Sequence, residues 1–536
     1  MNLSNVRHPQ TQPRQSRRTL VGIHHLPAGH SVRNSACAVA GDQGRHTEAD
    51  RQLNANPYEV IIVGSGAGGA AAAHRLAQHG VRVLIVEKGA ELPTDGSTLD
   101  DRQVVIHGRF LSREPWLDSQ GSTIYPEEHF NVGGKTRWYG AAVLRYSAEE
   151  FLDDGEFAAR GWPISLADFT PYYEEAEKLL GVRTFAIEPG LKKILDAIQA
   201  VDGAWTSTPL PMALSAGILE DPLEARHFDG FASVAHLKGD AESRFLQPVA
   251  SLANLTIRAE SEVVALLRDE ESAERAAGAD VRVRGVRLSN GENLYADTVM
   301  LAAGTLHSPR LLSRCIAGWD APQRPDKFDL VGRNLKKHVL TALIAVSLWQ
   351  PTDMLRKTML TTHADFPHSS LQPLGFDAEL IATLVPRYVP RLLARWIGRH
   401  AYGFFLQTED GANRDNRVYE QSPQKPVLDY DERRVPKSLA EHKAFTRAFK
   451  RVLLRIGMLS FTQRTGITGT AHVSGTLVMG SNADHAVVDT AGAVFGVAGL
   501  YVVDGSVLPR SSRVNPSLSI YAWGLRVADR WLQSRR

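Results

Sequence analysis

Residues 58 to 87 begin with an apolar run, pass through a glycine-rich turn and a stretch of small residues, and end with a second apolar run. The segment reads YEVIIVGSGAGGAAAAHRLAQHGVRVLIVE. A short apolar run before a glycine turn predicts a buried strand. The small and apolar positions Ala73, Leu76, Gly80 and Val83 suit a helix packed closely on a sheet. The pattern therefore predicts a strand, a helix and a second, parallel strand.

The spacing of the glycines in this unit is typical of dinucleotide binding. Gly64 permits the tight turn, Gly66 lets the backbone approach a pyrophosphate, and Gly69 lets the helix pack on the strand. The free N–H groups and positive dipole end of the helix face the phosphates. Glu87, 18 residues past Gly69, ends the second strand, where a carboxylate accepts hydrogen bonds from a ribose diol.

The remaining chain alternates strand and helix patterns without an internal repeat. LTIRAESEVVALLRD and VRVRGVRLSN each predict one strand, and the polar segment AERAAGAD predicts the turn between them. An apolar strand at 299–303 ends at Gly304, and Ser308 with Pro309 marks a helix start. The C-terminal region predicts a strand at 500–503 and a closing helix from Asn515 or Pro516. We expect an α/β fold with a doubly wound sheet.

Length, charge and cysteine content narrow the class of protein. A chain of 536 residues exceeds what one hydrophobic core usually serves, which predicts two domains or one domain with a large insertion. The net charge of +2 argues against nucleic acid as a partner. The only two cysteines, Cys37 and Cys315, supply neither a disulfide framework nor a cluster of metal ligands, and we expect no metal. No run of 18 or more apolar residues occurs, so we expect no membrane-spanning helix.

The first 57 residues differ from the rest in composition. They contain seven Arg and no Lys, few large apolar side chains and no sustained periodicity, which predicts disorder. SRRTLVG at 16–22 resembles a twin-arginine export signal, but no continuous apolar segment follows it. We therefore expect a flexible tail, or a start codon assigned too far upstream, on a cytoplasmic protein.

Four arginines in LVPRYVPRLLARWIGRH lie four residues apart and share one helical face. They are Arg387, Arg391, Arg395 and Arg399. Such a stripe suits either contact with an anionic membrane, with Tyr388 and Trp396 as interfacial anchors, or a solvated helix face. Pro386 and Pro390 shorten any helix available for docking, which favours the solvated face.

Five further segments extend the sequence pattern over the whole chain from residue 58. They are NVGGKTRWYGAA at 131–142, WPISLADFTPYYEEAEKLLGV at 162–182, AAGTLHSP at 302–309, VGRNLKKH at 331–338, and the region from AHVSGTLVMG at 471–480 to VNPSLS. Together with the N-terminal unit, and in this order, they resemble the glucose–methanol–choline (GMC) oxidoreductases. The resemblance implies an FAD enzyme whose FAD-binding segments lie at both ends of the chain.

The resemblance assigns two candidate catalytic residues near the C-terminus. His472 matches the histidine that faces the flavin, and Asn515 matches the second polar residue of the NP segment. A neutral imidazole is a suitable base for the hydroxyl proton of an alcohol, and a neutral amide orients the same oxygen. If His472 is the base, flavin reduction is expected to rise with pH through one ionisation near or above the unperturbed pKa of about 6.5.

Further positions are assigned to FAD by the same resemblance. Gly133 and Gly134 match the glycine pair beside the pyrophosphate and flavin, and Val263 matches a main-chain contact to adenine. Asp504 and Gly505 match the turn near the pyrophosphate and ribityl chain. Some members carry FAD on a histidine five positions after the first glycine of the pair. Trp138 occupies that position here, so we expect noncovalent FAD.

The resemblance also divides the chain into an FAD-binding domain in three parts and an interleaved α+β substrate domain. The expected segments are 1–57 as the extension, 58–150, 241–335 and 466–536 as FAD-binding parts, 151–240 as mainly cap, and 336–465 as the substrate-binding domain.

The expected reaction is oxidation of a primary or secondary alcohol to a carbonyl by hydride transfer to flavin N5. KTRWYGAAVLR looks closer to bacterial members that oxidise sugars, polyols and aminoglycoside-type alcohols. The electron acceptor is expected to be oxygen, a quinone or a cytochrome. Two alternatives are a redox-silent lyase on the same fold and a nonenzymatic flavin-binding protein. The second gives no reason to place His472 and Asn515 together.

Overall fold

The computed structural model describes residues 57–269, 281–317, 326–348, 351–353, 357–375, 378–384, 389–422 and 425–536. The predictions for residues 1–56, for the AERAAGAD turn at 273–280, and for Arg387 and Tyr388 lie outside the described residues.

The N-terminal strand, helix and strand form as predicted. β1 (Tyr58–Val63) leads into α2 (Ala67–Gln78), and β2 (Val83–Val86) pairs with β1 in parallel. Both strands are largely buried, which accounts for their continuous apolar sequence. On its other side β1 pairs in parallel with β9 (Asn293–Leu301), so β1 lies inside a sheet.

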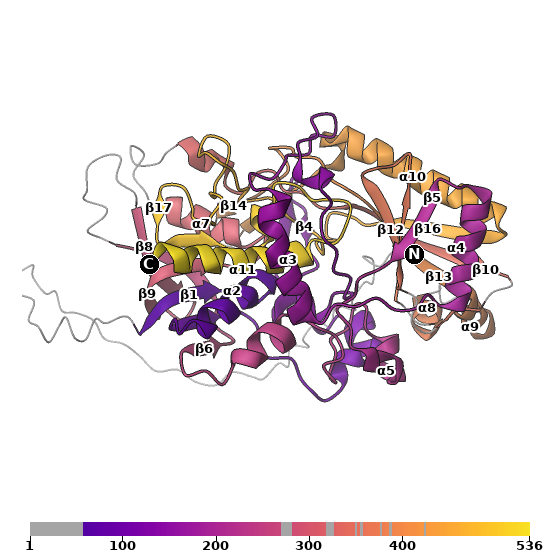
Figure 1. Cartoon of the computed structure of the whole chain (residues 1–536), viewed down its shortest axis with the longest axis horizontal. Helices are drawn as coiled ribbons and strands as arrows, with labels where there is room; N and C mark the ends of the chain where they lie inside the picture. The colour runs from indigo at the N-terminus through magenta and orange to yellow at the C-terminus, as the bar shows by residue number, and fades with distance from the viewer. Residues whose placement is uncertain are drawn as a thin grey trace, which may run out of the picture. The chain divides into compact units, whose positions relative to one another are not determined.

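This sheet has eight strands and contains segments from distant parts of the chain. Its order is β17 (Val497–Ala498), β8 (Val281–Leu288), β9, β1, β2 and β6 (Leu255–Arg258), with β18 (Leu500–Val502) on β9 and β7 (Val263–Arg268) on β8. The closing helix α11 (Ser517–Ser534) lies beside α2 (Figure 1). The predicted doubly wound α/β class is confirmed.

One strand prediction in this sheet is wrong. LTIRAESEVVALLRD forms two strands, because β6 pairs with β2 in parallel whereas β7 pairs with β8 in an antiparallel hairpin. The break lies at Glu260, whose φ of 52° is left-handed. There the N–H of Ser261 donates to the carbonyl of Glu87 at 2.8 Å. The break falls in the polar stretch RAESE at 258–262, which contains neither glycine nor proline, so the sequence carries no strong turn signal there.

A second sheet of six antiparallel strands forms the other large layer. Its order is β16 (Met458–Arg464), β10 (Val339–Ser347), β13 (Ala401–Thr408), β12 (Ser369–Pro373), β11 (Met359–His363) and β5 (Trp205–Pro209). Helices α10 (Pro436–Arg455) and α4 (Pro189–Val201) share its apolar core, which includes Phe404, Phe445 and Leu191 (Figure 1). This sheet is the interleaved α+β part of the predicted fold.

A third sheet and further helices complete the described elements. A four-stranded sheet has the order β14 (Arg417–Ser422), β15 (Lys425–Asp429), β3 (Trp116–Asp118) and β4 (Thr123–Ile124). The other α-helices are α3 (Leu166–Leu180), α5 (Pro222–Arg226), α7 (Ser308–Ala317), α8 (Ala378–Leu384) and α9 (Arg391–His400). The α9 helix starts directly after Pro390, as the proline predicts. Among the described residues, no helix combines the length and apolarity needed to cross a membrane.

Candidate functional site

Two glycine-rich turns meet at the carboxyl end of β1. Gly64, Gly133 and Gly134 have φ values of 103°, 83° and 57°, in the left-handed region that favours glycine. A Cβ on Gly134 would come 3.2 Å from Cα of Gly66, whereas a Cβ on Gly66 itself would have no atom within 4 Å. The predicted glycines therefore line one backbone cradle, and Gly66 faces open space.

Two glycines of the first turn instead serve packing. A Cβ on Gly69 would lie 2.2 Å from the carbonyl oxygen of Gly64, which confirms the close approach of helix and strand. A Cβ on Gly68 would lie 1.6 Å from the carbonyl oxygen of Val503. The role of Gly68 could not be predicted from the sequence, because its neighbour is more than 400 residues away in the chain and no local pattern reveals the contact.

Glu87 lies at the end of β2 and is bonded within the protein. Its Oε2 accepts hydrogen bonds from the backbone N–H of Ser65 at 2.9 Å and the Ser65 hydroxyl at 2.6 Å, and its Oε1 accepts from the N–H of Gly89 at 2.9 Å. Ser65 Oγ also accepts from the N–H of Gly133 at 3.0 Å. Burial raises the pKa of Glu87. Ser65, which sequence reasoning passed over, thus joins the acid to both glycine turns.

The turn at Asp504 ties the C-terminal segment to β9 and α7. One carboxylate oxygen accepts from the N–H of Gly304 at 2.8 Å and the hydroxyl of Ser308 at 2.5 Å. The other accepts from the N–H and hydroxyl of Ser506, at 2.9 and 2.5 Å. This carboxylate already accepts four hydrogen bonds. The carboxylate therefore fixes the loop that contains Gly505.

Val263 begins β7, two residues after Ser261. Since Ser261 is bonded to the carbonyl of Glu87, the start of β7 lies at the same end of β2 as the Glu87 carboxylate. This is the end of a parallel strand where the dinucleotide fold binds its ligand.

The two candidate catalytic residues lie in contact although they are 43 positions apart. Nδ2 of Asn515 lies 3.2 Å from Nε2 of His472. Oδ1 of Asn515 accepts a hydrogen bond of 2.5 Å from Nε2 of Gln372, which lies on β12 of the six-stranded sheet. Both predicted residues are only partly buried. Gln372 is a site residue that sequence reasoning did not find.

A second histidine contacts the other ring nitrogen of His472, Nδ1. Nδ1 of His338 lies 2.9 Å from Nδ1 of His472, and the two rings meet edge to face at 80°. An antiparallel bridge between Lys336 and Ser474 brings the two segments together. Continuing that register by two residues places His338 opposite His472. Both motifs belong to the family resemblance, but their pairing is invisible in the sequence.

The surroundings of His472 favour its neutral form. Its pKa is lowered well below the ordinary histidine value, mainly by burial and next by the His338 ring. The positive charges of Lys357 and Lys135 act in the same direction. The sequence-based expectation of a pKa near or above 6.5 is therefore wrong in direction. These groups come from other segments of the chain and could not be placed from the sequence.

Trp138, at the position of the flavin-linked histidine of some members, is buried. Its ring stacks on His129 with centroids 4.7 Å apart, and its Nε1–H donates to Oδ1 of Asn131 at 2.9 Å. An indole nitrogen that donates a hydrogen bond offers no nucleophile.

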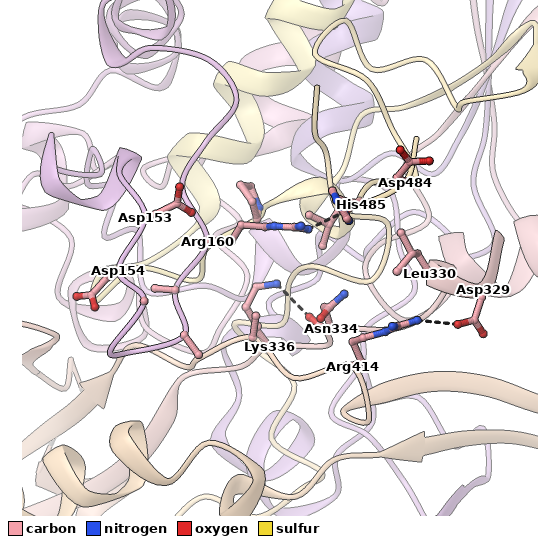
Figure 2. Close-up of a pocket in the computed structure, with 16 residues that line it drawn as sticks. Asp153, Asp154, Arg160, Asp329, Leu330, Asn334, Lys336, Arg414, Asp484 and His485 are labelled. Carbon is pink, nitrogen blue, oxygen red and sulfur yellow. Dashed lines mark hydrogen bonds and ion pairs between the residues drawn. The ribbon is translucent and has the colours of Figure 1, made fainter. Parts of the chain in front are cut away.

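A pocket of about 1220 Å³, lined by several charged side chains, contains Lys336 (Figure 2). Neither His472 nor Asn515 lines it. Its buried Lys336 donates to the carbonyl of Asn334 at 3.0 Å, and burial lowers the pKa of Lys336 to about 7. The other charged side chains in its lining are Asp153, Asp154, Arg160, Asp329, Arg414 and Asp484.

Comparison with known families agrees with this geometry. The description "NAD(P)-binding Rossmann-like domain" matches residues 62–109, which include the first glycine turn and Glu87. The description "GMC oxidoreductase" matches residues 413–524, which include His472 and Asn515. The C-terminal part of the chain thus carries the GMC oxidoreductase pattern.

Two curated relatives of the chain come from Streptomyces. The chain is 29% identical to 6'''-hydroxyparomomycin C oxidase of Streptomyces lividus, over 88% of this chain and 90% of that protein. It is 28% identical to paromamine 6'-oxidase of Streptomyces fradiae, with the same coverage. The 2-methyl-1,2-propanediol dehydrogenase of Mycolicibacterium austroafricanum is 24% identical, over 89% of this chain and 95% of that protein.

A solved structure shares the fold of the chain. Pyridoxine 4-oxidase from Mesorbium loti aligns with a TM-score of 0.62 at 18% identity, over 89% of this chain and 99% of that chain. The bare backbone at Gly66 and the left-handed glycine pair suit the FAD that this family binds, because side chains at these positions would fill the cradle.

Proposed function

We propose that this protein oxidises a CH–OH group of a polyhydroxylated substrate, a sugar or an aminosugar, to a carbonyl by hydride transfer to FAD. The contact of 3.2 Å between His472 and Asn515 is the observation that carries the proposal. Removal of a hydroxyl proton requires a base and is helped by a neutral hydrogen-bond donor to the same oxygen, and the two side chains place both groups side by side.

The residues that would hold FAD are the two glycine turns, Glu87, the start of β7 at Val263 and the Asp504–Gly505 loop. We propose that backbone N–H groups of the cradle and the α2 N-terminus bind the pyrophosphate, and that Glu87 accepts from the ribose. Oε1 of Glu87 accepts only one of the bonds described above and keeps a second lone pair for a ribose hydroxyl, whereas Oε2 already accepts two. Bound FAD supplies the acceptor for the hydride.

His472 is proposed as the general base. Its lowered pKa keeps the imidazole neutral at physiological pH, so a nitrogen lone pair is available for the hydroxyl proton. As the C–H bond breaks with its electron pair, the O–H proton passes to His472 and the C=O bond forms. Asn515 donates its amide N–H to the same oxygen and orients it without adding charge.

The substrate class rests on the relatives and on the polar residues beside the pair. The two Streptomyces relatives are named as oxidases of 6'''-hydroxyparomomycin C and of paromamine. Gln372 and Ser370 on β12 and Gln407 on β13 present polar side chains beside the segment that carries Asn515, since Ser370 Oγ and Gln407 Nε2 both donate to the carbonyl of Arg513. These buried amide and hydroxyl groups make the surroundings of the pair polar.

Anaerobic flavin bleaching with a panel of alcohols tests this proposal. We expect paromamine-type aminosugars and simple sugars to reduce the flavin faster than 2-methyl-1,2-propanediol or aliphatic alcohols. Admitting air afterwards then separates an oxidase, which recovers its colour rapidly, from a dehydrogenase. A protein that holds FAD but is bleached by no alcohol would contradict the proposal and favour the redox-silent lyase.

A further inference from the structure

The buried residue His338 determines which side-chain atoms of the candidate site donate hydrogen bonds and which accept them. His338 is fully buried, and its Nε2 lies 3.0 Å from the carbonyl oxygen of Ser512 and 3.3 Å from that of Ser511. A carbonyl oxygen only accepts hydrogen bonds, so Nε2 of His338 must carry a hydrogen. This assignment depends on heavy-atom positions alone.

The second nitrogen of His338 is then an acceptor. Burial lowers the pKa of His338 to about 4, so the ring is neutral and Nδ1 holds a lone pair. Nδ1 of His472, 2.9 Å away, must therefore donate the hydrogen between the two rings. Glu409, the acid whose charge acts on His338, is paired with Arg510 at 2.5 and 2.9 Å and with His368 at 2.9 Å.

This assignment also determines the state of Nε2 of His472, the nitrogen proposed to accept the proton. Because His472 is neutral and carries its hydrogen on Nδ1, its Nε2 holds the lone pair and accepts from the amide of Asn515. The Oδ1 of Asn515 then faces Gln372, whose amide must donate to it. The backbone carbonyls of Ser511 and Ser512 thus fix the donor and acceptor roles of four side chains in succession.

We propose that His338 is a positioning residue that holds His472 in its Nδ1–H tautomer and so keeps Nε2 available as the base. The catalytic meaning of this inference rests on the proposed function, whereas the tautomer itself does not. His338 makes no contact with the reacting atoms in this account. It acts through His472, as a partner that orients a catalytic imidazole does in other enzymes.

The Ser512 carbonyl, one of the two at the start of the chain of bonds, is itself held rigidly. Ser512 has a φ of 66°, a left-handed value that is costly for a residue other than glycine. Its hydroxyl donates to Glu150 at 2.5 Å and accepts from the N–H of Val514 at 3.1 Å, while its own N–H donates to Glu409 at 3.3 Å. These buried bonds maintain the strained conformation that directs the Ser512 carbonyl at His338.

Two substitutions at His338 separate positioning from packing. His338→Leu fills the space but offers no acceptor. His338→Asn can place its Oδ1 where Nδ1 lies and so accept from His472. His442→Leu is the control, because His442 is a buried histidine bonded to Thr341 and Thr408 and not to His472.

The readouts are ¹⁵N NMR of histidine-labelled holoenzyme, with His472→Ala to assign the signal, and anaerobic flavin reduction. We expect Nδ1–H in the wild type, the Asn variant and the His442 control, and a mixture of tautomers in the Leu variant. Flavin reduction in the Leu variant should slow by about tenfold to 10⁴-fold. The upper value is the rate loss found when a catalytic histidine is held in the wrong tautomer. The Asn variant should recover most of this loss.

An Nε2–H signal for His472 in the wild type would overturn the inference without any variant. So would an unchanged tautomer and rate in a Leu variant that retains FAD. If the Leu variant does not fold, the wild-type and Asn spectra still decide. Failure of every alcohol to bleach the flavin would remove the proposed function and leave the tautomer measurement standing.

Discussion

Gly134 and Gly66, 68 positions apart, lie so close that a Cβ on Gly134 would come 3.2 Å from the Gly66 Cα. The contact brings the second glycine turn over the first, at the carboxyl ends of the parallel strands. Gly66 remains open to the space that the two turns enclose, whereas Gly68 is covered by the carbonyl of Val503. Neighbouring glycines therefore have different functions, which substitution can separate.

We predict that Gly66→Ala weakens FAD binding without destabilising the apoprotein. The backbone of Gly66, with φ −67° and ψ −170°, accepts alanine, and the new methyl group meets no protein atom within 4 Å. Its effect falls on a ligand that approaches the backbone. FAD titration and thermal unfolding of the apoprotein measure the two quantities separately.

Gly68→Ala is the matched comparison. Its Cβ would lie 1.6 Å from the Val503 carbonyl oxygen, so the α2 N-terminus and the Asp504 loop must shift. We expect a loss of stability of about 1–3 kcal/mol, the usual cost of overpacking, together with lower FAD content. Equal loss of apoprotein stability in both variants would contradict the assignment of Gly66 to the cofactor.

The pH dependence of flavin reduction follows from the lowered pKa of His472. The neutral ring is the base, so the rate of reduction rises with pH through the pKa of His472. Since that pKa lies well below the ordinary value, the rising limb should fall on the acid side of about 6.5. Above it, His472 contributes no further change. A limb centred above 6.5 that disappears in His472→Ala would show that the surroundings do not lower this pKa.

Acid denaturation should release the flavin as free FAD. Trp138 replaces the histidine that carries flavin in some family members, and its indole nitrogen is occupied by Asn131. Precipitation with acid followed by absorbance of the supernatant measures the released fraction. Flavin retained in the pellet would show a covalent bond to another residue.

Asn515→Ala should slow flavin reduction by a smaller factor than loss of the base. It removes a neutral hydrogen bond, with a net contribution of about 0.5–1.5 kcal/mol, or roughly 2- to 13-fold in rate. Because Gln372 would lose its acceptor, Gln372→Ala combined with Asn515→Ala should cost less than the sum of the two single changes. Additive losses would show that the two amides act independently.

The sequence was sufficient to predict the elements whose signals are local. The turn from Gly64 to Gly69, the strand ending at Glu87 and the helix start at Ser308 all depend on neighbouring residues, and the structure has them where expected. The contact of His472 with Asn515 followed only from the family resemblance, because 43 residues separate them.

The parts that the sequence did not predict depend on contacts between distant segments. His338 reaches His472 through a strand register, Gln372 comes from another sheet, and Gly68 packs on the C-terminal region. The lowered pKa of His472 has the same origin, since burial and charges from three other segments produce it. Tertiary contacts of this kind leave no periodic pattern in a single sequence.

The most direct test of the account is anaerobic stopped-flow reduction of the flavin in His472→Ala, with the best alcohol from the panel. We predict that the variant retains FAD and that reduction slows by about 10²- to 10⁴-fold, while substrate affinity changes far less, because the lost interaction belongs mainly to the transition state. Reduction at close to the wild-type rate, in a variant with full FAD content, would make His472 a structural residue and contradict the mechanism.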